Sequence, residues 1–457
     1  MSGLPQGWTS AQLAALLAPN GLFSDGDWVE SKDQDPNGVI RLLQLADIGD
    51  GFFIDKSNRF INAAKFEELR CTELFESDVL IARMPDPLGR ACLMPKLPQR
   101  CITVVDVAVF RPGSNGVQPQ WLMHTINAPQ LRAEIELNSS GTTRKRISRG
   151  NLSAMLLPIP PLPEQKRIAD KLDTVLARVD ACRDRLDRIP ALLKRFRQSV
   201  LAAATSGKLT EDWREATELD LTLWREEPFG LLIHEMRNGL SPKPTEQPPG
   251  AKILRISAVR QGKVDFDDYR FLVVDQATRQ QYGLQQDDLL FTRYNGSLEF
   301  LGVCALVSIA QPDYVYPDKL IRVRVNKQKI APKFVELAFG SHFVRRQVED
   351  FVKSSAGQKG ISGGDLKTTE IPIPPLDEQH EIVRRVETLF AFADRLEARY
   401  ATARKQVEQL TPALLAKAFR GELVAQDPND EPAAELLKRL AAQREIAPKA
   451  RRGRKGA

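Results

Sequence analysis

The feature that most constrains this chain is a Pro-rich motif followed by a long apolar stripe, which occurs twice. Residues 160–209 begin PPLPEQKRIADKLD and residues 374–423 begin PPLDEQHEIVRRVE, an offset of 214 residues without a gap. In both copies, apolar residues recur at alternating spacings of four and three. A 3.5-residue period held over about four heptads is typical of helices that pair along a coiled-coil seam.

We expect the two helices to pair with each other through these apolar residues. The buried face of a helix in an ordinary globular core is the alternative, but a strict spacing repeated at a fixed offset favours the seam. The predicted seam residues are Ile168, Leu172, Val175, Val179, Leu186, Leu193, Ile382, Val386, Leu389, Leu396, Tyr400 and Val407.

The start of each helix is marked by the Pro-rich segment. PIPPLPEQ and PIPPLDEQ place Glu164–Gln165 and Glu378–Gln379 in the first turn, where acidic side chains face the positive end of the helix dipole. Roughly 40 residues at about 1.5 Å each predict helices of roughly 60 Å. Pro190 and Pro412 lie inside them and predict a kink or a break in each.

The length of 457 residues predicts more than one domain, built as two copies of one unit. No apolar run approaches the roughly 20 residues that span a bilayer, and the first ten residues lack the features of a signal peptide. We therefore expect a cytoplasmic protein without membrane contact. The five cysteines are scattered without a C-x-x-C pair, which argues against disulfides and zinc and predicts buried, small apolar residues.

The formal charge of +6 suggests nucleic-acid binding, but the excess is confined to the end of the chain. Residues 433–457 hold eight Lys or Arg and two Glu, so the rest of the chain is close to neutral. Any nucleic-acid binding must therefore come from local patches, and the last ten residues, PKARRGRKGA, are explained equally well as a solvated, disordered end.

Each long helix follows a segment that reads as a mixed α/β globule. Residues 8–17 suggest a short helix, 77–83 (SDVLIAR) a buried strand, and 120–136 a helix or helix pair. The second globule repeats the plan, with DDLLFTR at 287–293 matching SDVLIAR. The fold class is therefore α+β. The expected order is a globule (1–150), a helical region (151–225), a globule (226–365), a helical region (366–432) and the tail (433–457).

The repeated segments PIPPLPEQKRIADKLD with SGKLT and PIPPLDEQHEIVRRVE with RGEL, each preceded by ISRGNL or ISGGDL, resemble the specificity subunit of type I restriction-modification systems. The resemblance covers essentially the whole chain. It implies that the globules are target recognition domains and that the helices form an antiparallel coiled coil that acts as a spacer. It also implies that the helical regions dock two methyltransferase subunits.

Two like globules on antiparallel helices would give the chain pseudo-two-fold symmetry and suit it to a bipartite site in duplex DNA. Half-sites about one helical turn apart, about 34 Å, are within reach of helices of this length. Because the globules differ in sequence, the target should be asymmetric. The resemblance places adenine methylation and S-adenosylmethionine in the methyltransferase subunits. It places restriction in motor-nuclease subunits, where these are present, and no cofactor in this chain.

The candidate DNA contacts lie on loops. Arg, Lys, Asn and Gln read base edges in the major groove, whereas phosphate contacts need only basic or polar groups. A solvated surface cation is the alternative for each residue, and the equivalent place of these loops in both globules favours DNA contact. The predicted DNA-binding residues are Arg83, Arg90, Arg144, Lys145, Arg146 and Arg149 in the first globule, and Arg293, Tyr294, Asn295, Gln358 and Lys359 in the second.

The sequence offers no catalytic or metal-binding constellation. It lacks a methyltransferase's Asn-Pro-Pro-aromatic motif and the G-x-x-x-x-G-K-[ST] loop of a motor, and its four histidines show no ligand spacing. We therefore expect a non-catalytic DNA-reading subunit. A coiled-coil scaffold whose globules bind proteins and an orphan nuclease are the alternatives. DNA binding that depends on salt and sequence separates the first from a scaffold, and metal-dependent cutting by the chain alone would identify the nuclease.

Overall fold

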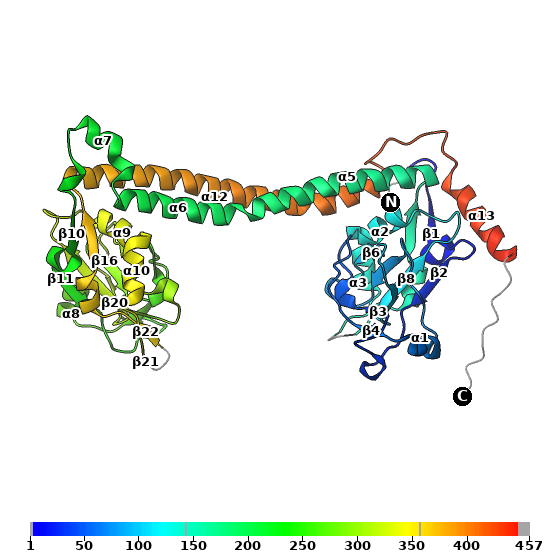
Figure 1. Ribbon diagram of the computed structural model, residues 1–457, viewed down its shortest axis with the longest axis horizontal. Coiled ribbons are helices and arrows are strands. Elements are labelled where there is room, and N and C mark those ends of the chain that lie inside the picture. Colours follow the sequence, from blue (N-terminus) through cyan, green and yellow to red (C-terminus); the bar gives the residue numbers. More distant parts are fainter. Residues whose placement is uncertain (1–2, 142–143, 356–357, 447–457) are drawn as a thin grey trace. The chain divides into compact units, whose positions relative to one another are not determined.

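The computed structural model describes residues 3–141, 144–355 and 358–446, without the side chains of 353–355, 358, 359 and 446. It divides into two compact units. Unit 1 takes in the described parts of Met1–Leu186 and Ala403–Ala457, and unit 2 is Asp187–Thr402. Each unit holds one globule and a portion of the long helices (Figure 1).

Globule 1 is built on an antiparallel sheet of strand order β2-β8-β5-β6, a second sheet of order β4-β3-β7, and the pair β1-β9. Apolar side chains from both sheets and from the helices form its core. The strands are β1 (Thr9–Gln12), β2 (Leu22–Asp25), β3 (Ile40–Leu43), β4 (Phe60–Ile61), β5 (Val79–Ala82), β6 (Ala91–Leu93), β7 (Arg100–Thr103), β8 (Val107–Arg111) and β9 (Leu156–Ile159). The helices are α1 (Ala63–Leu69), α2 (Pro119–Asn127), α3 (Pro129–Leu137) and α4 (Arg149–Ala154).

Globule 2 repeats this topology, with sheets of order β11-β20-β16-β18 and β15-β12-β19 and the pair β10-β23. It also carries the hairpin β13-β14 and a small sheet of order β17-β22-β21. Its strands are β10 (Arg225–Pro228), β11 (Ile233–Asn238), β12 (Ala251–Leu254), β13 (Val259–Arg260), β14 (Lys263–Val264), β15 (Tyr269–Leu272), β16 (Leu289–Thr292), β17 (Tyr294–Asn295), β18 (Cys304–Leu306), β19 (Tyr314–Val315), β20 (Leu320–Val325), β21 (Lys353–Ser355), β22 (Gln358–Gly360) and β23 (Glu370–Ile373). Its helices are α8 (Gln276–Tyr282), α9 (Pro332–Gly340), α10 (His342–Asp350) and α11 (Gly363–Thr368). The predicted internal repeat is therefore confirmed.

The long helices are α5 (Leu162–Asp187), α6 (Ile189–Thr205) and α12 (Leu376–Ala418). The first predicted helix is broken at Arg188, two residues before Pro190, whose ring nitrogen carries no hydrogen and so removes one helical hydrogen bond. The second is one helix of 43 residues that continues through Pro412, so of the predicted kink or break, a break does not occur there.

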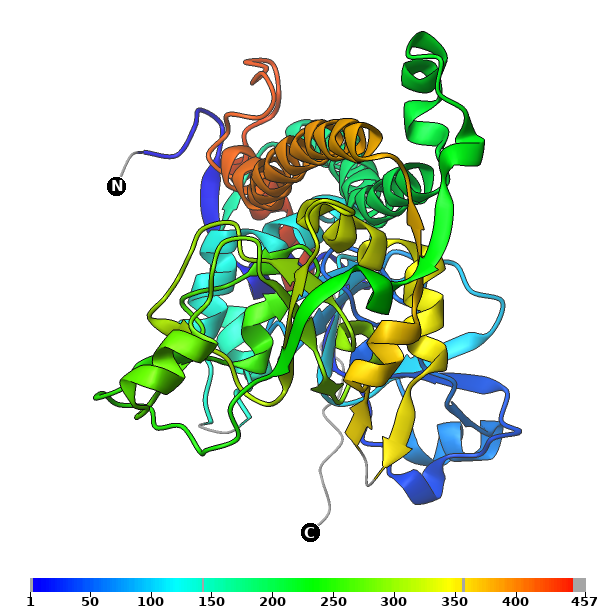
Figure 2. The same cartoon turned by 90° about the vertical axis from the view of Figure 1, so that its left-hand side faces the viewer.

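The helices pair antiparallel within each unit. In unit 2, Arg197 of α6 contacts Asp394 of α12, and further along the chain the Leu209 carbonyl accepts a hydrogen bond from Arg385. In unit 1, the first turns of α5 and the last turns of α12 share one apolar cluster with globule 1. In unit 2, α9 packs on α6 and on β18, and α7 (Glu211–Ala216) lies on the opposite side of the helix pair from globule 2 (Figure 2).

Every predicted seam residue is buried or half-buried. Ile168 and Leu172 belong to the core of globule 1, and Ile382 and Val386 to that of globule 2. The apolar stripe therefore serves both as a helix-pairing seam and as part of each globular core. Cys182 of the stripe is exposed, unlike the other four cysteines, so its predicted burial is wrong.

The ends of globule 1 differ from the expectation. The predicted helix at 8–17 is wrong in its first half, because Thr9–Gln12 is the strand β1, which pairs antiparallel with β9. Only Leu13–Leu16 is helical, as the 3₁₀ helix η1. The pair β1-β9 carries globule 1 to Ile159, and the equivalent pair β10-β23 carries globule 2 from Arg225 to Ile373. The other 3₁₀ helices are η2 (Ser31–Asp33), η3 (Leu45–Asp47), η4 (Lys208–Thr210), η5 (Leu221–Leu223), η6 (Phe229–Leu232), η7 (Ile256–Ala258) and η8 (Leu298–Phe300).

The region assigned to the basic C-terminal tail, 433–457, contains a packed helix that the sequence analysis did not predict, α13 (Ala433–Ile446). Leu436 and Leu440 are buried in the core of globule 1, and the Ala433 amide donates to the Gly7 carbonyl at 2.9 Å. Two leucines four residues apart lie on one face of a helix, which is why this segment folds despite its charge. The remaining tail, 447–457, lies outside the described residues.

We predict that Leu440→Ala destabilises unit 1 by about 2–5 kcal/mol, because it removes a fully buried leucine side chain. Lys438→Ala changes an exposed residue of the same helix and should have almost no effect. Hydrogen exchange of peptides from each unit would report the two effects separately. Equal behaviour of the two variants would show that α13 does not stabilise globule 1.

Candidate functional site

Each globule is fixed to its long helix by a buried glutamine. In unit 1, Gln165 in the first turn of α5 is inaccessible to solvent. Its Oε1 accepts a hydrogen bond from the backbone amide of Gln118, the N-cap residue of α2, at 3.0 Å. Its Nε2 donates to the Pro160 carbonyl at 3.0 Å. One side chain thus joins the Pro-rich motif, the helix start and a helix of the globule.

The same arrangement recurs in unit 2. Gln379 accepts a hydrogen bond from the Ala331 amide at 2.7 Å, at the N-cap of α9, and donates to the Pro374 carbonyl at 2.8 Å. Sequence reasoning placed these glutamines in the first helical turn but missed their burial. The signal was their identical place in both copies of the motif.

The preceding glutamates are equivalent in position but differ in their partners. Glu164 is buried and accepts a hydrogen bond from the Trp8 indole at 3.0 Å, while its Oε1 has no hydrogen-bond partner among the described residues. Burial raises the pKa of Glu164 above its usual range, against the opposing effects of Trp8 and the nearby Arg167.

Both carboxylate oxygens of Glu378 have hydrogen-bond partners. It accepts hydrogen bonds from the Trp224 indole at 2.8 Å and the Thr210 hydroxyl at 2.6 Å, and it forms an ion pair with the buried Arg214. The two units therefore place a glutamate at the same position of the helix, but only in unit 2 is its charge balanced by a buried arginine.

Two of the predicted DNA contacts in globule 1 lie in its interior. Arg83 is 6% exposed; it donates to the Ile147 carbonyl at 3.0 Å and forms an ion pair with Asp25. Arg90 is 7% exposed and donates to the carbonyls of Leu45 and Pro87 at 2.8 and 2.9 Å. Burial lowers the pKa of both guanidinium groups. These contacts hold both side chains inside the globule, so we leave them out of the proposed DNA interface.

The exit loop of globule 1 presents the remaining predicted cations. Arg144 and Lys145 are exposed and form no ion pair with any residue that the structure describes. Arg146 lies 3.3 Å from a carboxylate oxygen of Asp106. Arg149, at the start of α4, is about half exposed and lies 4.0 Å from Asp25. Arg144 and Lys145 are the cations of this loop that are free to meet a ligand.

In globule 2 the structure brings the predicted residues together in one small sheet. Strand β17 pairs antiparallel with β22, so that Tyr294 lies opposite Gly360 and Asn295 opposite Lys359. The Arg293 guanidinium lies 4.8 Å from the centre of the Tyr294 ring. The side chains of Gln358 and Lys359 lie outside the described residues. Figure 1 shows this sheet at the end of globule 2 that is remote from α6 and α12.

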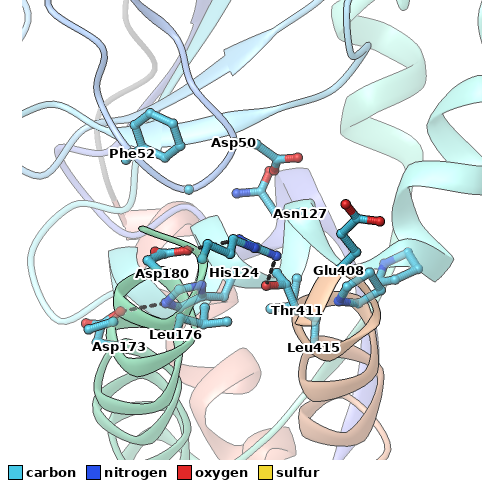
Figure 3. A pocket seen from close by; sticks show the side chains of 15 residues that line it. Asp50, Phe52, His124, Asn127, Asp173, Leu176, Asp180, Glu408, Thr411 and Leu415 are labelled. Carbon is cyan, nitrogen blue, oxygen red and sulfur yellow. Dashed lines mark hydrogen bonds and ion pairs between the residues drawn. The ribbon is translucent and has the colours of Figure 1, made fainter. Parts of the chain in front are cut away.

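A cleft of about 550 Å³ opens in unit 1 between α2, the loop around Phe52, α5 and α12 (Figure 3). At its wall, the buried His124 forms a 2.7 Å contact with Asp173 of α5. Arg183 of α5 donates to the Thr411 hydroxyl of α12 at 2.9 Å. The first contact joins globule 1 to α5, and the second joins α5 to α12.

Two searches of the described residues give negative results. No group of three or more His, Cys, Asp or Glu side chains within 3–141, 144–355 and 358–446 is placed to hold a metal ion. No helix in the same ranges is long and apolar enough to cross a membrane.

Comparison with known protein families gives one clear relationship. The family described as Type I restriction modification DNA specificity domain matches residues 26–191 and 233–403, once in each repeat. The type I restriction enzyme EcoKI specificity subunit of Escherichia coli (strain K12) is 44% identical over 357 residues, covering 76% of each chain. The StySPI specificity subunit of Salmonella potsdam is 35% identical over 456 residues, covering 97% of each chain.

Two solved structures share the fold. A chain from a study of complex assembly and conformational transition of the type I R-M system matches with a TM-score of 0.68 and 18% identity, covering 92% of this chain and 100% of that chain. The HsdS subunit from Thermoanaerobacter tengcongensis matches with a TM-score of 0.61 and 18% identity, covering 92% of this chain and 98% of that subunit.

Replacing each of the two equivalent glutamates, Glu164 and Glu378, by glutamine should change the stability of its unit in opposite directions. Glu378→Gln leaves Arg214 buried without its counter-ion and should destabilise unit 2 by roughly 3–5 kcal/mol. Glu164→Gln removes a buried charge whose Oε1 has no partner in the described structure, and it should stabilise unit 1 at pH 7 by about 1 kcal/mol.

The effect of Glu164→Gln on stability should depend on pH, because the pKa of Glu164 is raised. The stability linked to this group is fully present below its unfolded-state pKa and is lost as pH rises through the raised folded-state pKa. The advantage of Glu164→Gln should therefore shrink as pH falls from 7 towards 4. Urea unfolding followed by hydrogen exchange in each unit would test this, and effects of equal sign would contradict it.

Proposed function

Because the chain belongs to the type I restriction modification DNA specificity domain family, we propose that it selects the duplex sequence on which separate methyltransferase subunits act. The observation that carries the proposal is that both repeats match this DNA specificity domain and both fold into the same globule. The relatives at 44% and 35% identity are themselves named specificity subunits.

The target is an asymmetric, bipartite site. Each globule recognises one half-site. The two recognition surfaces differ in the small sheet β17-β22-β21, which the described part of globule 1 does not form. Globules with different surfaces select different half-sites, because base edges are recognised by specific side chains. In globule 1, the exposed Arg144 and Lys145 contact the duplex, with Arg149 beside them.

The chain is non-catalytic and acts through its partners. Two methyltransferase subunits dock on the helix pair, bind S-adenosylmethionine and methylate adenine, and motor-nuclease subunits join where restriction occurs. Exposed apolar side chains on the long helices support this docking, notably Leu192 of α6 at 52% exposure and Phe392 of α12 at 49%. Large apolar side chains that are exposed on a free subunit are typical of surfaces that a partner covers.

We predict that cells carrying this chain and its methyltransferase modify a split, asymmetric motif that is unmodified in cells lacking this chain alone. Single-molecule sequencing of modified bases gives the motif directly. Replacing globule 1 by that of another specificity subunit should change one half of the motif and leave the other half unchanged.

The alternatives give different results in the same cells. Unchanged methylation without the chain would reject the specificity role and favour a protein-binding scaffold. Metal-dependent cutting of DNA by the purified chain alone would identify an orphan nuclease.

We also predict that Leu192→Asp combined with Phe392→Asp weakens methyltransferase binding by at least about 2 kcal/mol, because a charge would enter a desolvated interface. Co-purification and titration of the tagged chain would measure the loss. Lys405→Asp, an exposed change on α12, serves as a charge control. Equal losses in both variants would indicate a charge effect without an apolar docking site.

A further inference from the structure

Strand register aligns the two globules residue by residue around the end of the central strand. Ala82 of β5 lies opposite Val107 in globule 1, and Thr292 of β16 lies opposite Leu320 in globule 2. Arg83 and Arg293 therefore occupy equivalent positions. Each donates its backbone amide to the residue before the partner strand and accepts a hydrogen bond from an exit-loop isoleucine.

The side chains around these equivalent arginines carry different charges. Asp25, the ion-pair partner of Arg83, lies opposite Ala108 in globule 1. The equivalent strand position in globule 2 is Asn238, opposite Ile321. The residue that accepts the arginine amide is Asp106 in globule 1 and Lys319 in globule 2. At these two equivalent positions, the carboxylates of globule 1 are thus replaced by an amide and an ammonium group in globule 2.

A third difference makes room for an aromatic ring. The exit-loop residue before the equivalent isoleucine is Arg146 in globule 1 and Gly360 in globule 2. A Cβ atom on Gly360 would lie 2.6 Å from the ring of Tyr294, so only glycine fits beneath this ring. The guanidinium of Arg293 and the ammonium of Lys319 lie 4.8 and 5.3 Å from the ring centre.

Among the described residues, these two cations have no ion-pair partner. Neither Arg293 nor Lys319 forms an ion pair with any residue within the described ranges. The Nε of Arg293 is buried without a hydrogen-bond partner there. The Tyr294 ring holds the guanidinium in place, which lowers the entropy lost when it binds a ligand.

The cationic surface continues into a neighbouring cleft of about 500 Å³. Lys319 lines this cleft together with Lys243, Arg255 and Arg270, and Asp318 is the acidic residue in its lining. Outside the lining, Glu246 lies 2.6 Å from Arg255 and 2.8 Å from Arg270, and Asp268 lies 3.5 Å from Arg255. Lys319 and Lys243 are thus the lining cations that form no ion pair with a described residue. Two lysines of this kind beside a fixed arginine suit a nucleic acid, whose phosphates are anionic and whose bases carry hydrogen-bond acceptors.

We propose that Arg293, held on Tyr294, reads one base pair of the half-site recognised by globule 2, and that Lys319 and Lys243 hold the adjacent phosphates. This inference rests on the proposed DNA-reading function. The base edge that fits is guanine, whose N7 and O6 accept two hydrogen bonds from one guanidinium. Globule 1 reads its half-site differently, because Arg83 is neutralised by Asp25 and buried.

The test uses the chain assembled with its methyltransferase subunits and S-adenosylmethionine. The probes are a duplex carrying the methylated motif and duplexes in which each base pair of the motif is replaced in turn. Arg293→Lys keeps the charge but removes the bidentate fork, so discrimination at one G·C pair should fall by about 10- to 100-fold. Discrimination at the other positions should remain unchanged.

Lys319→Ala should weaken binding to all sequences and reduce the slope of log K against log salt by about one unit. Lys327→Ala is the matched control, because Lys327 follows the opposite end of β20, is exposed and pairs with Asp287. Asn238→Asp, which restores the carboxylate position of globule 1, should weaken binding in the same direction as Lys319→Ala.

The outcomes separate this inference from the proposed function. A wild-type complex without sequence preference would refute both. A specific wild-type complex with unchanged discrimination in Arg293→Lys would refute the base-reading role alone. Uniform weakening in Arg293→Lys would show a phosphate contact and would also overturn that role. Thermal unfolding of each variant checks that the fold is retained, and Asn238→Asp tests the site with Arg293 in place.

Discussion

The buried glutamine at the start of each long helix is the interaction on which the rest of the structure depends. Gln165 and Gln379 each satisfy a backbone amide at the N-cap of a globular helix and a carbonyl of the Pro-rich motif. An unpaired buried amide costs roughly 1–3 kcal/mol, so the helix and the globule are held in one orientation. This rigid junction lets a long helix carry a recognition surface without a flexible linker.

A repeated scaffold leaves its variable positions free to change. The sheets of the two globules have the same strand order, and their cores are filled by equivalent elements. Charge differs at equivalent positions of this scaffold, as at Asp25 and Asn238. One backbone can therefore present a neutralised arginine in one copy and an uncompensated arginine in the other.

The sequence predicted the helices, the repeat and the globules well, because these depend on local periodicity. It did not reveal that Arg83 and Arg90 are buried, because their partners come from distant strands and loops. It also failed for α13, since the counted charges concealed Leu436 and Leu440 on one face. For Arg293, Tyr294 and Asn295 it chose residues that the structure brings together, although nothing in the sequence distinguished Arg293 from Arg83.

The sequence by itself determined the family and the order of globules and helices, because heptad spacing and the repeated Pro-rich motif are written along the chain. Tertiary structure alone decided which cations are free. The charge of an arginine is compensated when an aspartate from another strand lies beside it. The pairing of strands, and not the distance along the sequence, decides which residue lies there. The closing pairs β1-β9 and β10-β23 were likewise decided in three dimensions, because each joins residues about 150 positions apart.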